Sequence, residues 1–81
     1  MVENITQFIV QELLQKSADY ELGQDQELLL SGLVDSLGIM LLVNHISDEF
    51  DFEVPPQDVT IENFSTVRIL VNYLKSKNVK F

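Results

Sequence analysis

The sequence predicts an all-α domain: a bundle of three main helices and one short helix, with a long loop between the first and second main helices. Apolar residues recur in three segments at the spacing of an amphipathic helix. No segment shows the alternating pattern of a half-buried strand, and Pro, Gly, Asp and Ser residues separate the helical segments. We therefore expect helices that pack around a shared apolar core.

The chain length limits the protein to one domain. A chain of 81 residues buries only about 60% of the surface that it exposes when unfolded, so it forms one core. We expect residues 1–81 to be that single domain. The chain has no cysteine, so neither a disulfide nor a cysteine zinc site adds stability. So small a core leaves little room for a substrate cleft, and we expect the protein not to be an enzyme.

The first helix is expected at residues 2–17, and a long loop follows it. Apolar residues in this segment have helical spacing, and Ser17, Asp19 and Gly23 then mark its end. A structureless loop of this length is uncommon in a compact domain. We therefore expect the loop to be ordered and pinned to the core by its apolar residues, which are Leu28, Leu29, Leu30, Leu33 and Val34.

The second helix is expected to begin at Asp35 and Ser36 and to run to about Phe50. Asp and Ser are preferred helix caps, and the apolar period begins directly after them. With about 100° of rotation per residue, one side of this helix, the expected core side, gathers Ile39, Leu42, Val43, Ile46 and Phe50. The opposite side is also partly apolar and gathers Leu37, Met40, Leu41, Asn44 and Asp48.

Three large apolar side chains on this outward side need an explanation, because a surface helix is normally polar there. One explanation is a docking surface for partner proteins, in which Met40 is an adaptable contact. The other is that the preceding loop folds back and covers the three side chains. Both explanations leave Ser36 at the N-terminal edge of the patch.

The remaining helices are expected between Pro55 and the end of the chain. Pro55 and Pro56 end any preceding helix, and Asp58 opens a short helix that extends to Glu62. Ser65 then caps the last helix. Its apolar residues recur at the helical period and are expected to cover the core side of the second helix: Val67, Leu70, Val71 and Leu74.

The formal charge of −8 is unevenly distributed, since no Lys or Arg occurs from Ser17 to Val67. All the acidic residues except Glu3 and Glu12 fall in that stretch. Such a surface repels nucleic acid, and it serves either solubility alone or the steering of basic partner proteins. The N-terminus is unlike a signal peptide, and no segment is expected to span a membrane. We expect a cytoplasmic protein and a monomer.

No residue is predicted to be catalytic or to bind a metal. His45 is the only histidine, and one histidine without cysteines forms neither a catalytic triad nor a zinc site. We expect it to have a structural or solvent-facing role. The acidic residues from Asp48 to Asp58 lack the central glycine and terminal glutamate of a calcium-binding loop.

The motif around Ser36 gives the second helix a more specific interpretation. A phosphodiester attached to a serine at a helix N-terminus would lie near unpaired backbone N–H groups and the positive end of the helix dipole. The stretch Ser31–Leu37 resembles the attachment motif of the acyl and peptidyl carrier protein family, whose serine receives 4'-phosphopantetheine from coenzyme A. Residues 49–55 and 63–67 resemble the same family at matching spacing, so the resemblance covers effectively the whole chain.

The resemblance implies a carrier that catalyses nothing itself. It implies that Ser36 is the modified serine, Asp35 the acidic neighbour used by the phosphopantetheinyl transferase, and Leu37 a hydrophobic recognition contact. The cargo is then an acyl or aminoacyl thioester, exchanged with a loading enzyme and with downstream acyltransferases or synthases. Fatty-acid carriers commonly have acidic residues early in this helix, where this chain has Gly38 and Leu41. The difference predicts less ionic recognition and a specialised pathway.

Two alternatives stay open at this point. Gly32–Ser36 resembles free-standing aminoacyl, peptidyl and D-alanyl carriers as much as fatty-acid carriers. An unmodified helical adaptor that binds a partner helix through Leu37, Met40 and Leu41 fits the same pattern. Incubation with coenzyme A and a broad-specificity transferase separates the two classes, because only a carrier gains mass.

Overall fold

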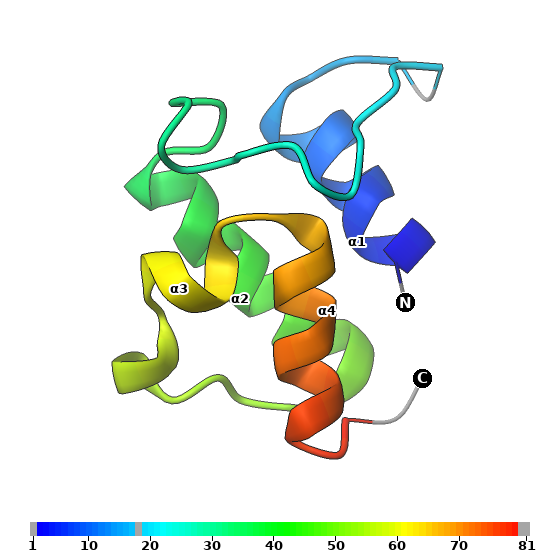
Figure 1. Ribbon diagram of the computed structural model, residues 1–81. Helices are drawn as coiled ribbons and strands as arrows, with labels where there is room; N and C mark the ends of the chain where they lie inside the picture. Colours follow the sequence, from blue (N-terminus) through cyan, green and yellow to red (C-terminus); the bar gives the residue numbers. More distant parts are fainter. Residues whose placement is uncertain (1, 18, 80–81) are drawn as a thin grey trace.

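The computed structural model describes residues 2–17 and 19–79, and every regular element within them is helical. The elements are α1 (Val2–Phe8), the π-helical η1 (Ile9–Leu13), α2 (Ser36–Phe50), the 3-10 helix η2 (Pro56–Asp58), α3 (Ile61–Phe64) and α4 (Val67–Ser76). The long loop crosses one end of the bundle between η1 and α2 (Figure 1). The predicted all-α fold is confirmed, although two short helices, η2 and α3, stand where one was expected. None of the described helices has the length and apolar character needed to cross a bilayer.

One core holds these helices together. α1 contacts both α2 and α4, and α3 contacts α4. The apolar residues predicted to face the core from α4 are all buried, whereas Val43 and Phe50 of α2 are only half-buried. The largest fully buried side chains come from every helix except η2, and from the loop: Ile5, Ile9, Leu28, Leu42, Ile46, Phe64, Val67, Leu70 and Leu74.

The first helix is shorter than the predicted range of 2–17. Its last turns widen into η1, and the N–H of Leu14 donates to the carbonyl of Ile9 at 2.8 Å. Gln15 then takes a left-handed conformation, with φ of 54°, which turns the chain away from the helix axis. Leu13 and Leu14, which come directly before this turn, both pack against the core, so the apolar pattern alone did not show where the helix ends.

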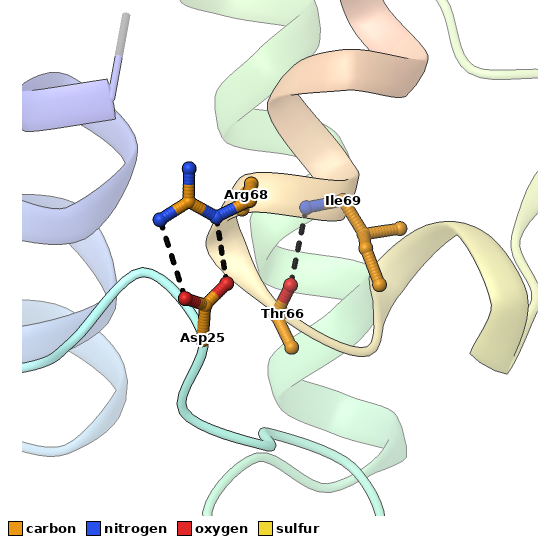
Figure 2. Close-up of polar contacts among 4 residues, drawn as sticks. All are labelled: Asp25, Thr66, Arg68 and Ile69. Carbon is orange, nitrogen blue, oxygen red and sulfur yellow. Dashed lines mark hydrogen bonds and ion pairs between the residues drawn. The ribbon is translucent and has the colours of Figure 1, made fainter.

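Two predicted caps are wrong by one or two residues. Asp58 lies in η2 and does not open α3, which is instead capped by the hydroxyl of Thr60. Thr66, and not Ser65, caps α4, and its hydroxyl accepts from the N–H of Ile69 at 3.1 Å (Figure 2). Adjacent Ser and Thr are both good caps, so residue preference did not distinguish them.

The long loop is attached to the first turn of α4. The N–H of Leu28 donates to the carbonyl of Ser65 at 2.8 Å, and the N–H of Arg68 donates to the carbonyl of Gln24 at 3.0 Å. The Arg68 guanidinium also donates two hydrogen bonds to the Asp25 carboxylate, at 2.7 and 3.2 Å (Figure 2). These hydrogen bonds lower the pKa of Asp25 and raise the pKa of Arg68.

The loop side chains meet the prediction with one exception. Leu30 is 73% exposed because it lies in a tight turn, closed by a 3.1 Å hydrogen bond from the N–H of Gly32 to the carbonyl of Leu29. Gly32 takes a φ of 81° in this turn, a conformation that other residues rarely adopt. The apolar residues that do pin the loop are buried or half-buried: Leu28, Leu29, Leu33 and Val34.

Candidate functional site

Ser36 is the first residue of α2 and is exposed to solvent. The residue before it, Asp35, has an extended backbone, and its carboxylate accepts from the N–H of Gly38 at 2.8 Å. This cap satisfies one N–H of the first turn and fixes where the helix begins. The predicted range of α2, from Ser36 to about Phe50, is confirmed. The Ser36 hydroxyl therefore stands at the positive end of the α2 dipole.

Gly38 lets three side chains lie close to the first turn of α2. A Cβ at this position would stand 2.9 Å from Val34 Cγ1, 3.4 Å from Asp35 Oδ1 and 3.7 Å from Leu13 Cδ1. The first distance is shorter than two carbon atoms normally approach. No acidic side chain fits at residue 38 unless Val34 moves, so the glycine has a packing reason.

A groove of about 620 Å³ lies beside Ser36, and we call it the α2–α3 groove. This volume lies within the range of about 300–1,000 Å³ that is usual for small-molecule sites. Sequence reasoning missed Thr60 and Ile61 as residues of this site, because a four-residue helix is too short to show a period. Besides residues of the loop, the lining consists of Ser36, Ile39, Met40, Val59, Thr60, Ile61 and Phe64.

The outward side of α2 is open to solvent. Leu37 and Met40 are each 65% exposed, and Leu41 is 45% exposed. Asn44 and Asp48, further along the same side, are also exposed. The loop does not cover the patch, so the explanation that it folds back over these side chains is wrong.

His45 is a residue of α2, and its side chain lies between α1 and α2, away from the start of α2. Its ring stacks on Phe8 with 4.1 Å between the ring centroids, and its Nε2 is 2.6 Å from Asn4 Oδ1. These contacts pack one helix against the other. Among residues 2–17 and 19–79, no group of His, Asp and Glu side chains is arranged to hold a metal ion.

The chain matches a protein-family model and is similar to chains of known structure. A family model described as a phosphopantetheine attachment site matches residues 7–74, a range that includes the whole of α2. A solved structure described as "Crystal structure of FAD-dependent dehydrogenase" contains a chain with 33% sequence identity and a TM-score of 0.76. The alignment covers 85% of this chain and 96% of that one, so the two chains are similar in length.

Proposed function

The chain belongs to the phosphopantetheine attachment family, which includes the acyl and peptidyl carrier proteins, and we propose on this basis that Ser36 bears the arm. Domains of this family are sites of covalent 4'-phosphopantetheine attachment, so the chain is a phosphopantetheine carrier protein. The choice of Ser36 rests on its position. It is the serine that combines an exposed side chain, the first position of an α-helix and a place in the wall of the α2–α3 groove.

The surroundings of Ser36 fit both ends of such an arm. A phosphodiester on its Oγ lies at the positive end of α2, where the N–H groups of Ser36 and Leu37 have no acceptor within the helix. The α2–α3 groove has space beside it for a flexible chain. When bound, the arm supplies a terminal thiol that holds the cargo as a thioester. The tether raises the concentration of the cargo at each partner enzyme.

The recognition roles and the cargo are part of the same proposal. Asp35 and Leu37 flank Ser36 and are exposed, which supports their contact with the phosphopantetheinyl transferase. The absence of acidic side chains at Gly38 and Leu41 supports a specialised acyl or aminoacyl carrier, served by its own loading enzyme and by downstream acyltransferases or synthases. We also propose that residues 1–81 are one carrier domain and that its partners perform all the chemistry.

The similar solved structure suggests one further partner. It is described as an FAD-dependent dehydrogenase, and its matched chain is about as long as this one. A helical domain of this length has no room for a flavin pocket beside its core. We therefore include among the partners an FAD-dependent dehydrogenase that oxidises the cargo on the arm. With such an enzyme from the same genome, the loaded carrier should bleach the flavin absorbance without oxygen, and the same group on free coenzyme A should not.

Intact-mass measurement tests the attachment site. After incubation with coenzyme A and a broad-specificity phosphopantetheinyl transferase, the parent should gain the mass of one arm. Ser36→Ala should gain none, while its helix loses at most about 1 kcal/mol of stability. Ser31→Ala, a change of another exposed serine in the same stretch, is the matched control and should be modified fully. A mass gain in Ser36→Ala excludes Ser36 as the site, and no gain in the parent favours the unmodified adaptor.

A further inference from the structure

Tyr73 of α4 has its hydroxyl group beside a carboxylate of another segment. Tyr73 is buried, with 8% of its surface exposed, and its ring lies 6.4 Å from the ring of Phe52 and 6.5 Å from the ring of Phe64, measured between centroids. The hydroxyl donates to the Asp58 carboxylate at 2.6 Å. Burial and this carboxylate both raise the pKa of Tyr73, so the hydroxyl keeps its proton and stays a donor in neutral solution.

Asp58 connects α4 to α3. It is the last residue of η2, and its side chain is only 23% exposed. Its carboxylate accepts the hydrogen bond from Tyr73 and lies 3.9 Å from the Lys77 ammonium. Its backbone carbonyl accepts from the side-chain amide of Asn63, a residue of α3, at 2.9 Å. One residue therefore joins both helices.

The segment that follows Asp58 forms one wall of the α2–α3 groove. The residues of this wall are Val59, Thr60, Ile61 and Phe64. An isolated helix as short as α3, with four residues, is not stable in water, so contacts with the rest of the domain hold it. Phe64 is fully buried and fixes the end of α3, whereas Ile61 at its start is 53% exposed. The bonds at Asp58 therefore hold the other end of the wall.

Loss of the Tyr73 hydroxyl would release this end of the wall. In the described part of the chain, the Lys77 ammonium would then be the remaining ionic contact of the Asp58 carboxylate. Lys77 is 46% exposed and 3.9 Å away, so the ion pair contributes little. A carboxylate without its hydrogen bond is unfavourable where it is shielded from water. Asp58 would turn toward the solvent, and Phe64 would be left as the main anchor of α3.

We propose that Tyr73 and Asp58 form a clasp that holds the α3 wall of the α2–α3 groove in place. With the clasp closed, the groove has its observed width. When the hydroxyl bond breaks, residues 59–63 move about Phe64 and the groove widens beside Ser36. Tyr73 does not line the groove itself, so it is a positioning residue that acts through Asp58. Access to the groove then depends on the equilibrium between the closed and open states.

A single introduced thiol measures how often the clasp opens. The chain has no cysteine, so Ile39→Cys places the only thiol at a residue that lines the groove and is 7% exposed. Val10→Cys is the matched control, because Val10 is also buried but lies in η1, away from this groove. Intact mass follows alkylation of each unmodified full-length protein by iodoacetamide, at urea concentrations below the unfolding transition. The urea dependence separates local opening from unfolding, because only unfolding exposes enough surface for a steep rise in rate.

Tyr73→Phe removes the hydroxyl and keeps the ring. It should speed alkylation at residue 39 by about tenfold or more, and this faster rate should depend little on urea. The rate at residue 10 should stay below it and rise steeply with urea. Asp58→Ala should act like Tyr73→Phe, and the two changes together should add nothing, because they break one bond.

Two conservative changes serve as controls for the clasp. Asp58→Asn keeps an acceptor for the Tyr73 hydroxyl, so it should speed alkylation at residue 39 less than Asp58→Ala does. Tyr20→Phe changes the other tyrosine of the chain, which is 39% exposed. It should leave the rates at residues 39 and 10 unchanged.

Two results would overturn the proposal. One is an unchanged rate at residue 39 in Tyr73→Phe, and the other is a rate there that rises with urea as steeply as the rate at residue 10. The second result would mean that the pair stabilises the whole domain and does not control the groove. The measurement needs no arm, so it is independent of the mass test of Ser36. A mass gain with an unchanged alkylation rate keeps the carrier function and removes the clasp, and a faster, urea-independent rate without a mass gain does the reverse.

Discussion

Replacing Gly38 by alanine tests how tightly the start of α2 is packed. The new Cβ would lie 2.9 Å from Val34 Cγ1 and 3.4 Å from Asp35 Oδ1. Val34 is buried, with 3% of its surface exposed, and a β-branched side chain has few alternative rotamers. Neither Val34 Cγ1 nor the new Cβ can therefore move away without displacing the loop or the Asp35 cap.

Two opposing effects set the size of the change. Alanine is favoured over glycine inside a helix by about 1 kcal/mol. Forcing an additional carbon into a packed site costs typically 1–3 kcal/mol, and disturbing the Asp35 cap adds up to about 1 kcal/mol. The unfavourable contributions are larger, so we expect Gly38→Ala to lower the free energy of unfolding by about 1–2 kcal/mol.

Urea unfolding followed by far-UV circular dichroism measures this free energy. Gly23→Ala is the control, because a Cβ there meets no atom within 4 Å and its φ is not positive. It should raise stability by about 0.4–1 kcal/mol. Val34→Ala removes the clashing methyl, so adding Gly38→Ala to that variant should cause no loss. If Gly38→Ala stabilises the parent and the Val34→Ala variant by the same amount, the close packing at this position is refuted.

Three further predictions concern the core, the outward side of α2 and the loop. Leu42 is fully buried, so Leu42→Ala should cost about 2–5 kcal/mol in urea unfolding; unchanged stability would mean that α2 is rotated. Leu41→Glu should change stability by no more than about 0.5 kcal/mol. It should slow acylation by the cognate loading enzyme and speed acylation by a fatty-acid malonyltransferase with a basic docking surface; two unchanged rates would place Leu41 outside both interfaces. Because the hydrogen bond from Arg68 lowers the pKa of Asp25, this pair stabilises the fold above the ordinary pKa of Asp25 and loses its effect as pH falls through the lowered value. Asp25→Asn should therefore reduce the loss of stability below about pH 4, and an identical acid profile would contradict the pairing.

The start and end of α2 could be predicted because local and periodic signals agree there. Asp35 is a strong cap, and the residues after it form one apolar side of the helix, on which Leu42 and Ile46 are buried. In α4, too, the cap and the apolar period agree, although the cap is Thr66 and not the predicted Ser65. At the end of the first helix the apolar pattern and the backbone disagreed, because Leu14 is apolar although η1 ends at Leu13.

The α2–α3 groove could not be predicted, because it depends on where separate segments meet. The groove forms where α3, a helix of four residues, lies beside Met40 of α2. The bond between Asp25 and Arg68 joins residues 43 positions apart. Nothing in either local sequence identifies the other as its partner.

The attachment of the loop to α4 has a consequence for how the domain folds. Leu28 lies in a segment without regular structure, yet its N–H is bonded to Ser65 and its side chain is buried. Exchange of this amide with solvent deuterium will follow the opening of α4 and not the motion of a loop. Contacts between such distant segments form only after the intervening chain has closed. A nascent chain that ends before Ser65 already contains Ser36, but it lacks the contacts that hold the loop before it in place.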